Sequence, residues 1–555
     1  MAVITPDSDV ILLKVPLEID DTNQLTFATA SDQYTYFYGL TGKKSYEKFT
    51  YQRKDGVIRI PEKMDDIINY NYVMYRNNGS PNKWFYAYIT GMEYVNEEVT
   101  AVSIKTDCFQ TWQFDLTYKR CFVEREHTNS DDRGNNTLPE NVELGEYVKN
   151  SNVATPEIGA TVMLYAIGVS EIVGELTKDG NPVTPTANIN GLPNGLYYIF
   201  ADTIGKFQTI SHIYDHAGKA NAIYTMFVFP KEILNVVQGQ SSSYAYTSGV
   251  SWDYSDSTYT ASVSGLYIPT SNDLVGTISK ANTVSIPTTV GMTYTPRNKK
   301  LLTYPYCFFN IANNCGTTVT YKYEDFSSTP SFDLVGVFDV GCSTKLYPTN
   351  YKNITLSTDN PYEYGISGGK YPTISWNSDS YTNWLTQNAV NIGLGMLGAA
   401  AGTIGGLASG HVGVAAASLY TGVTGAVSQI YKASLMPDQA KGNTNTGDLN
   451  YSAHKNKFTV FPLSIKPEYA AIIDDYFDMF GYKTNRVKIP NVTGRPNWNY
   501  VKTIGCYIQA DIPQEDLQTI KSMFDKGVTF WHNASTFGDY SQSNAIVPPT
   551  PSPST

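Results

Sequence analysis

AVNIGLGMLGAAAGTIGGLASGHVGVAAASLYTGVTGAVSQIY, from Ala389 to Tyr431, is the stretch from which the rest of this 555-residue chain is best interpreted. It is the heart of 52 consecutive residues, between Asp379 and Lys432, that contain no Asp, Glu, Lys or Arg. Hydrophilic sequence flanks it on both sides. Because burying uncharged apolar sequence is favourable, the segment either fills a protein interior or enters a lipid bilayer.

The residues Gly410–Gly413 divide this apolar segment into two halves of about 20 residues. As a helix, each half is long enough to cross a hydrocarbon core of ~30 Å. Small residues recur every fourth position in both halves: Gly398, Gly402, Gly406 and Gly410, then Ser418, Gly422 and Ala426. Small residues at this interval allow helices to pack closely in lipid.

The segment is poorly suited to a permanent anchor. Each of its ten glycines costs a helix in water about 0.8–1 kcal/mol relative to Ala. Seven large aliphatic residues in the first half supply only about −2 to −4 kcal/mol for insertion. We therefore expect conditional membrane activity, with the segment stored in one state and released into another. The alternative is a Gly/Ala-rich hairpin that fills an interior cavity.

The predicted membrane-active residues are the apolar side chains, the small-residue ladder and the central turn. They are Ala389, Val390, Ile392, Leu394, Met396, Leu397, Gly398, Gly402, Ile404, Gly406, Leu407, Gly410, His411, Val412, Val414, Leu419, Gly422, Val423, Ala426, Val427 and Ile430. His411 is the one imidazole among them, and its protonation would oppose insertion of the turn. The alternative is a polar loop tip with no trigger role.

The composition around this segment is typical of a mainly β protein. Charged residues make up only 16% of the chain, Tyr reaches 43, and short runs rich in Tyr, Val, Ile, Phe and Thr alternate with Gly, Pro and Asn. We expect β-barrel or sandwich-type domains with a few short helices. The net charge of −11, without a Lys/Arg-rich patch, argues against binding through nucleic-acid phosphates. It suits a surface that repels DNA passing over it.

Hydrophobic patterns and turn signals predict the individual elements. Strands are expected at Val10–Val15, Gln33–Phe37, Val57–Ile60, Trp84–Ile89, Val99–Ile104, Cys121–Glu124, Thr161–Val169, Gly195–Phe200, Ala222–Phe229, Tyr259–Tyr267, Phe458–Phe461, Tyr500–Ile508 and Gly527–Trp531. Helices are expected at Met64–Tyr70, Pro467–Phe480 and Gln514–Asp525.

The chain begins without a secretory signal pattern, so we expect a soluble polypeptide made in a reducing cytoplasm. Its six scattered cysteines are then free core thiols: Cys108, Cys121, Cys307, Cys315, Cys342 and Cys506.

Changes in composition predict six segments. They are an N-terminal β tube domain (1–127), an outer or inserted β-rich domain (128–295), a middle β domain (296–384), the apolar membrane-active loop (385–445), a C-terminal α+β tube domain (446–545) and a disordered Pro/Ser tail (546–555).

The block YAAIIDDYFDMFGYKTNRVKIPNVTGRPNWNYVKT, Tyr469–Thr503, resembles the tail-knob (distal tube, or major tail) proteins of small short-tailed bacteriophages of Gram-positive bacteria. Three more blocks support the resemblance in the same order: QLTFATASDQYTYF at Gln24–Phe37, FVEREH at Phe122–His127 and LLTYPYCFFNIANN at Leu301–Asn314. The family also keeps a long apolar loop before its C-terminal β region. The likeness is densest after Leu301 and weakest over 140–295.

The resemblance implies a virion protein, made in the host cytoplasm, that assembles as a homohexameric tube at the far end of the tail. Its apolar loops would occlude the lumen and then help to breach the host cytoplasmic membrane. Phage DNA would pass through without specific binding. The other partners implied are tail proteins on the proximal (connector) side and at the tip.

No catalytic residues, cofactor or metal site are predicted. His212, Asp215 and His216 lack the H-E-x-x-H pattern and are interpreted as surface residues. Glu124 and Glu126, with Arg125 between them, are interpreted as a charged strand end or a subunit-interface salt bridge, although paired carboxylates can also hydrolyse sugars. The alternative function is therefore a receptor-binding or wall-degrading tail component. It would use the aromatic middle region, as in SSSYAYTSGVSWDYSD.

Overall fold

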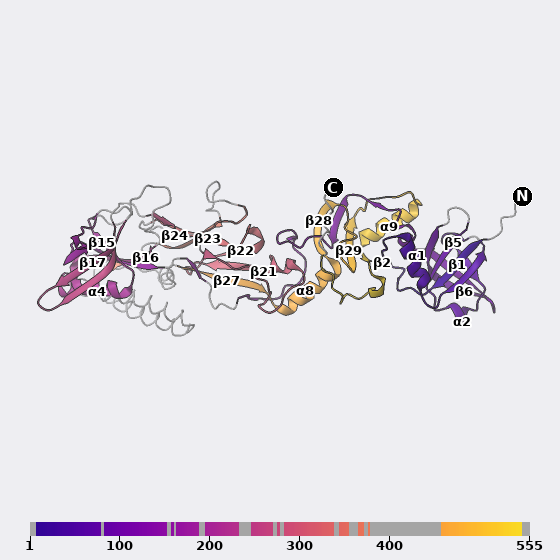
Figure 1. Ribbon diagram of the computed structural model, residues 1–555, viewed down its shortest axis with the longest axis horizontal. Coiled ribbons are helices and arrows are strands. Elements are labelled where there is room, and N and C mark those ends of the chain that lie inside the picture. The colour runs from indigo at the N-terminus through magenta and orange to yellow at the C-terminus, as the bar shows by residue number, and fades with distance from the viewer. Residues whose placement is uncertain are drawn as a thin grey trace, which may run out of the picture. The chain divides into compact units, whose positions relative to one another are not determined.

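The computed structural model describes residues 7–50, 52–78, 83–151, 157–159, 162–187, 195–231, 246–269, 275–277, 282–337, 343–353, 364–370, 376–377 and 457–546. In these ranges the chain is mainly β, as predicted, and it forms two compact units (Figure 1). Unit 1 contains Met1–Gly145, Tyr294–Leu301 and Pro467–Thr555. Unit 2 contains Glu146–Thr293 and Leu302–Lys466. Three separate passes of the chain therefore build unit 1.

The first sheet of unit 1 is antiparallel and has six strands. Their order is β3 (Lys44–Phe49), β1 (Ser8–Leu13), β5 (Tyr72–Asn77), β6 (Trp84–Asn96), β7 (Val99–Thr106) and β4 (Val57–Ile60). Both faces of β1 are buried: Val10 and Leu12 pack into one core cluster, and Ile11 and Leu13 into another. This explains why its sequence is a continuous apolar run instead of an alternating one.

The second sheet of unit 1 joins the two ends of the chain. Its order is β2 (Asn23–Leu25), β31 (Val528–Trp531), β29 (Trp498–Ile504), β9 (Cys121–Glu126) and β28 (Tyr482–Lys488). β2 and β31 pair in parallel although they lie about 500 residues apart. The rings of Trp498 and Trp531, 5.3 Å apart, pack in the same cluster as Ile11 and Leu13, so the two sheets share a core. Beside them lie the short pair β8 (Thr117–Tyr118) and β30 (Ile508–Gln509) and the helix α3 (Cys108–Trp112).

The predicted helices of unit 1 are confirmed as α2 (Met64–Ile67), α8 (Pro467–Phe480) and α9 (Gln514–Lys526). The strand predicted at Gln33–Phe37 is wrong, because this region is the helix α1 (Ala30–Gly39). The Thr29 side chain caps the helix by accepting a hydrogen bond from the Asp32 backbone. Gln33 and Phe37, four residues apart, form its buried face.

The strand predicted at Tyr500–Ile508 is also corrected. β29 ends at Ile504, and Gly505 follows with a φ of 67°. This left-handed conformation favours glycine and breaks the strand before β30.

The described residues of unit 2 form three sheets. The eight-stranded sheet has the order β14 (Asn181–Pro182), β13 (Glu175–Lys178), β17 (Tyr246–Ser255), β18 (Thr260–Pro269), β15 (Tyr197–Ala201), β12 (Met163–Val169), β16 (Ile223–Pro230) and β26 (Trp376–Asn377). The second has β10 (Tyr147–Lys149), β27 (Lys457–Ile465), β21 (Cys307–Ala312) and β22 (Thr318–Tyr321), with β11 (Glu157–Gly159) also on β27. The third has β19 (Val275–Thr277), β23 (Ser331–Val337), β24 (Ser343–Pro348) and β25 (Ile366–Lys370), with β20 (Asn282–Thr283) on β23.

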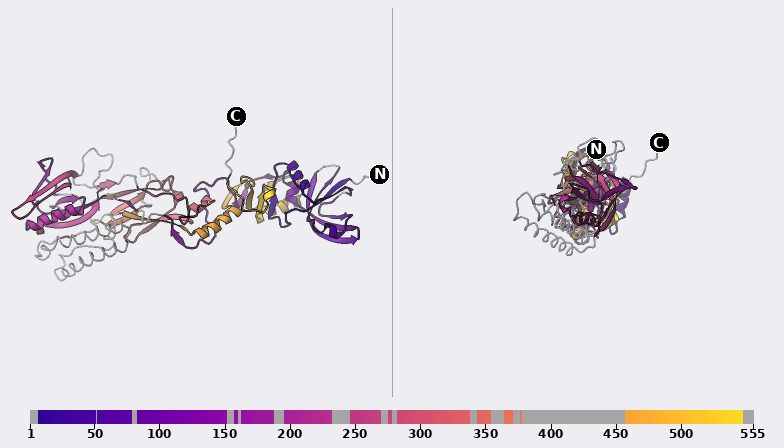
Figure 2. Two further views of the ribbon diagram at one scale, coloured as in Figure 1. Left: turned by 60° about the horizontal axis from the view of Figure 1, so that its bottom comes forward. Right: turned by 90° about the vertical axis from the view of Figure 1, so that its left-hand side faces the viewer.

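The sequence predicted neither α3 nor α4 (Ile204–His216). α4 packs on the eight-stranded sheet against β12, β15 and β18 (Figures 1 and 2). Thr203 caps it in the same way as Thr29 caps α1. Short 3-10 turns complete the described elements: η1 (Ala220–Ala222), η3 (Lys299–Leu302), η4 (Tyr323–Asp325) and η7 (Ala534–Thr536).

Phe309 lies at the centre of the aromatic core of unit 2. Its ring centroid is 4.9 Å from that of Tyr323, 5.6 Å from that of Tyr321 and 5.9 Å from that of Phe326. Burying a side chain of this size contributes about 1.5–3 kcal/mol, and ring pairs add about 0.5–1.5 kcal/mol. The block LLTYPYCFFNI thus contributes Cys307, Phe309 and Ile311 to the core of this unit.

The prediction of free thiols is confirmed for five cysteines. Cys108, Cys121, Cys307 and Cys506 are buried and Cys315 is half-buried. Cys342 lies outside the described residues.

Candidate functional site

All the predicted membrane-active residues, from Ala389 to Ile430 and including His411, lie outside the described residues. The structure describes the strands on either side of them. β26 precedes the apolar segment at the edge of the eight-stranded sheet, where Asn377 pairs with Thr225 of β16. β27 follows it in the interior of another sheet, between β10 and β21. The apolar segment therefore connects two different sheets of unit 2.

Within the described ranges, none of the helices has both the length and the apolar character needed to span a bilayer.

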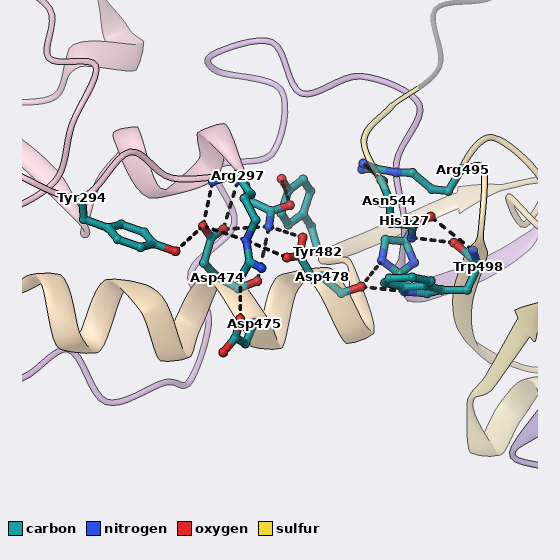
Figure 3. Close-up of polar contacts among 11 residues, drawn as sticks. His127, Tyr294, Arg297, Asp474, Asp475, Asp478, Tyr482, Arg495, Trp498 and Asn544 are labelled. Atoms are coloured by element: carbon teal, nitrogen blue, oxygen red, sulfur yellow. Dashed lines mark hydrogen bonds and ion pairs between the residues drawn. The ribbon is translucent and has the colours of Figure 1, made fainter. Parts of the chain in front are cut away.

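The described residues of unit 1 bring together a group of polar side chains, the polar node, from all three passes of the chain (Figure 3). Its centre is buried, whereas the side chains of Arg297 and Asp475 are exposed. Its members are His127, Asp131, Tyr294, Arg297, Asn298, Asp474, Asp475, Asp478, Tyr482, Arg495, Trp498 and Asn544.

Asp474 of α8 is the centre of the polar node and is fully buried. Its carboxylate accepts hydrogen bonds from the Tyr294 hydroxyl at 2.8 Å and from the backbone of Arg297 at 2.7 Å. The backbone and side-chain amides of Asn298 donate to it at 3.0 and 2.7 Å. Burial, followed by the hydrogen bond to Asp474, raises the pKa of Tyr294, so this hydroxyl stays protonated and donates. Asp474 thus fastens the short pass Tyr294–Leu301 to α8.

Arg297 forms ion pairs with the three carboxylates on α8. Its guanidinium binds Asp475 and lies 3.0 Å from Asp478 and 3.6 Å from Asp474. Burial raises the pKa of Asp478, while hydrogen bonding from Asn298 and the charge of Arg297 oppose this. The three carboxylates therefore already share a cation, Arg297, and form an ion network on α8.

His127 is held as a neutral imidazole with a defined tautomer. The backbone N–H of Tyr500 donates to its Nδ1 at 2.7 Å, so the proton resides on Nε2, which donates to the Asp478 carbonyl at 2.9 Å. Trp498 Nε1 donates to the same carbonyl at 2.8 Å. Burial, helped by the charge of Arg495, lowers the pKa of His127 to about 3. His127 and Trp498 thereby satisfy a carbonyl at the end of α8 that the helix cannot.

The end of α8 also requires a glycine. Gly481 has a φ of 63° and donates to the Phe477 carbonyl at 2.8 Å, as expected of a glycine that terminates a helix. A Cβ atom here would overlap the backbone of Glu126 and His127. The C-terminus of α8 is therefore packed directly against the end of β9.

A second buried ion network lies in the same unit around Glu140. Lys300 and Glu140 are both nearly inaccessible and lie 2.5 Å apart. Arg125 also binds Glu140, and the backbone of Lys483 donates to it at 2.9 Å. This pair joins the second pass of the chain to the first.

The charged run at Glu124–Glu126 is confirmed as part of a strand, β9, with intrachain partners. Glu124 lies 3.0 Å from Lys502. Glu126 is fully buried, binds Lys488 and accepts a hydrogen bond from the backbone of Asn491 at 2.9 Å. These carboxylates are therefore occupied by structural partners.

The histidines His212 and His216 are confirmed as surface residues. Both lie on the exposed side of α4, and the His216 ring stacks on Tyr259 with centroids 4.0 Å apart. Among the residues that the structure describes, no group of His, Cys, Asp and Glu side chains is arranged to hold a metal ion.

Reasoning from sequence missed the polar node, although one signal was available. Asp474 falls on the apolar stripe of α8, between Ala470, Ile473 and Phe477. A carboxylate at a core position of an amphipathic helix requires buried partners. Its partners, however, lie about 180 residues away in the chain.

The comparisons with known proteins cover nearly the whole chain. The family described as the C-terminal domain of tail knob protein gp9 of Bacillus phage phi29 matches residues 274–545, and the family of caudoviral major tail protein N-termini matches residues 7–117. Tail knob protein gp9 of Bacillus phage B103 is 28% identical over 602 aligned positions, which cover 97% of this chain and 98% of that protein. Tail knob protein gp9 of Bacillus phage phi29 is 26% identical, with the same coverage.

The fold is also shared with a solved structure, the tail knob protein gp12 of bacteriophage C1. The TM-score is 0.61 at 13% identity, over 98% of this chain and 100% of that chain. The family matches at both ends and the two gp9 relatives, which cover nearly the whole chain, show that the chain belongs to the tail knob proteins of short-tailed bacteriophages and is a structural component of the virion tail.

Proposed function

We propose that six copies of this chain form the distal tube, or knob, of the tail, and that their apolar segments first plug its lumen. On release the segments insert into the host cytoplasmic membrane and open a path for the genome. The observation that carries this proposal is the uncharged, glycine-laddered stretch Ala389–Tyr431 in a chain that is otherwise polar and acidic. Small residues at four-residue spacing support close helix packing in lipid.

The energetics support action by several copies together. The first half of one segment contributes only about −2 to −4 kcal/mol to insertion, which is marginal, whereas six copies together contribute about −12 to −24 kcal/mol. The attachment of the segment supports release without unfolding. Residues 378–456 connect β26 to β27, and the proposed release requires neither strand to lose its pairing.

The remaining features fit a passive conduit. A net charge of −11 gives a surface that repels DNA instead of holding it. The protein has no catalytic role in this proposal. Its partners are further copies of itself, the tail proteins on its proximal side and at its tip, and the membrane.

The predicted segments are proposed as the parts of this tube: 1–127 and 446–545 form its wall, 128–295 an outer domain, 296–384 a middle domain and 385–445 the membrane-active loop. The tail 546–555 takes no part in the wall.

Dye release from liposomes tests the proposal. We would compare the full-length protein with a variant that lacks residues 385–440, between pH 5 and 7.5. We expect leakage with the full-length protein alone. The pH dependence of this leakage tests whether protonation of His411 controls insertion. If neither folded protein causes leakage, the membrane-breaching role of the segment is wrong.

The alternative function is glycan binding or wall degradation by the aromatic middle region. The burial of Trp252, the tryptophan in that region's aromatic block, argues against it. Trp252 is fully buried, and its Nε1 donates to the Val173 carbonyl at 2.6 Å. Its ring therefore belongs to the core and is not available for stacking on a sugar. Tight retention on purified cell walls, or release of sugar fragments from them, would nevertheless favour this alternative.

A further inference from the structure

Two buried cysteines of unit 1 lie side by side although they come from different passes of the chain. Cys121 is the first residue of β9, in the first pass, and Cys506 follows the end of β29, in the third. Cys121 is 6% exposed and Cys506 is 7% exposed. The function proposed above gives neither of them a role.

The backbone brings these two residues together. Ile504 pairs with β9, and farther on the backbone N–H of Lys119 donates to the Tyr507 carbonyl at 3.0 Å. Cys121 and Cys506 lie between these two contacts, on adjacent stretches of chain. Directly opposite Cα atoms of antiparallel strands are about 4.5–5.5 Å apart. A disulfide usually requires a Cα separation of about 4.4–6.8 Å, so neighbouring positions of this kind are suited to one.

The side chains meet because the strand is interrupted between them. In a regular ladder, Cys121 and Cys506 would point to opposite faces of the sheet, but Gly505, with a φ of 67°, breaks the alternation. The thiol of Cys506 and the backbone N–H of Tyr507 both hydrogen-bond to the Cys121 sulfur. The backbone N–H of Cys506 donates to the Asp525 carboxylate at 3.0 Å, which fixes the position of Cys506.

A third thiol nearby has a different partner. Cys108 packs in the same apolar cluster as Cys506, but its Sγ donates to Asp516 Oδ1 at 3.3 Å. Cys108 is therefore engaged with a carboxylate, whereas Cys121 and Cys506 are engaged with each other.

We propose that Cys121 and Cys506 are a modification site, at which a disulfide forms once the virion has left the reducing cytoplasm. The two thiols lose two protons and two electrons, and dissolved oxygen or a small disulfide accepts the electrons. With a small disulfide RSSR, one thiolate displaces RS⁻ and forms a mixed disulfide. The second thiolate then displaces the other RS⁻, so the products are the protein disulfide and two RSH.

The surroundings of the two thiols make this reaction slow in the folded protein. Burial raises the pKa of the Cys506 thiol to about 12, and burial also raises the pKa of Cys121. Few thiolates are therefore present at neutral pH. Both residues lie at strand ends, where local opening costs least. The pair thus remains reduced while the protein is made and oxidises later, in the released particle.

The disulfide would join the first and third passes of the chain. It closes a loop that contains all of unit 2. Cross-links that close long loops remove the most entropy from the unfolded chain. The sheet that contains β9 and β29 would therefore resist unfolding outside the cell. This inference goes beyond the proposed function, because it concerns unit 1 and does not depend on membrane insertion.

Oxidation of the full-length protein tests the site. One folded sample is incubated with oxidised glutathione and another with a reducing agent. Both are then denatured with iodoacetamide and digested without reduction. We expect mass spectrometry to find the peptides of Cys121 and Cys506 joined in most chains of the oxidised sample, and separately alkylated in the reduced one. Oxidation should also raise the midpoint temperature of unfolding by at least about 5 °C.

Serine variants provide the controls, with circular dichroism to verify that each is folded. Cys121→Ser and Cys506→Ser should each lose the joined peptide and the rise in midpoint. Cys307→Ser removes a buried thiol of unit 2 and should keep both.

Three results would overturn the proposal. They are two alkylated thiols in the oxidised wild type, a disulfide that joins Cys506 to Cys108 instead, and glutathione adducts at Cys121 or Cys506 that never resolve to the protein disulfide. Because the bond itself is measured, none of these results bears on the membrane role of the apolar segment.

Discussion

Unit 1 and unit 2 stabilise their interiors by different means. The core of unit 2 around Phe309 is built from aromatic and aliphatic side chains that are close-packed. Unit 1 has apolar clusters too, but among the described residues it buries several charged side chains, including Asp474, Glu126 and Lys300, whereas unit 2 buries one, Asp333. Each of these three charges in unit 1 bonds to a segment from another pass of the chain.

The difference reflects how each unit is assembled from sequence. Three passes of the chain must meet in unit 1, and one of them, Tyr294–Leu301, is only eight residues long. So short a segment buries little apolar area, and hydrogen bonds from its backbone to Asp474 fix its position instead. We expect the stability of unit 1 to be sensitive to the loss of single polar groups, and that of unit 2 to the loss of side-chain volume in its core.

The largest effect is expected for Asp474→Ala in unit 1. It removes the acceptor of the Tyr294 hydroxyl and of the backbone N–H groups of Arg297 and Asn298. Removing one side of a buried ionic network costs about 3–5 kcal/mol. Hydrogen exchange measured by mass spectrometry separates the units, and protection should fall in peptides from Tyr294–Leu301 and α8 while unit 2 is unchanged.

Asp475→Ala is the matched control for this substitution. Asp475 is the next residue of the same helix, its side chain is 66% exposed, and it contacts Arg297 alone among the partners described here. An exposed ion pair contributes about 0–1 kcal/mol. Equal effects of the two substitutions would contradict the role assigned to Asp474.

The helices and strands were largely predictable because their signals are local. α8 has the predicted bounds, since Pro467 starts it and Gly481 stops it. The error at Gln33–Phe37 has a local cause as well. Its aromatic residues favour a strand, but the Thr29 cap and the i,i+4 spacing of Gln33 and Phe37 favour a helix, and the helix forms.

The polar node could not be predicted, since its bonds join distant segments. The Tyr294 hydroxyl and Asp474 are 180 residues apart, and the imidazole of His127 lies between residues more than 350 positions away. The local sequence indicates only that a carboxylate, Asp474, lies on the apolar face of α8. The donors that bind the Asp474 carboxylate come from a segment that joins unit 1 only after the chain has passed through part of unit 2.

A smaller, pH-dependent effect is expected from His127. Burial lowers the pKa of His127 to about 3 in the folded chain, against about 6.5 when unfolded. Between these values the unfolded chain binds the proton and the folded chain does not. The free energy of unfolding therefore decreases as the pH falls below about 6.5, by about 1.4 kcal/mol per pH unit, or about 2 kcal/mol between pH 6.5 and 5.

His127→Gln isolates this contribution, because glutamine does not titrate. The two proteins share every other titrating group, including the buried His532, whose burial lowers its pKa to about 4. Urea unfolding of both at several pH values, followed by hydrogen exchange in unit 1, should show the difference in stability changing with pH by this amount. Parallel pH curves would contradict a neutral, buried His127.

The smallest effect is expected for Phe309→Leu in unit 2, at about 1–2 kcal/mol. Leucine keeps most of the apolar contact but loses the ring pairs with Tyr321, Tyr323 and Phe326. Phe461→Leu on β27 is the control, since Phe461 is 40% exposed and should change stability by less than about 0.5 kcal/mol. Because no charge is involved, the loss at Phe309 should be the same at pH 5 and 7.5. A loss that varied with pH would mean that the core of unit 2 also depends on buried ionisable groups, and the contrast with unit 1 would fail.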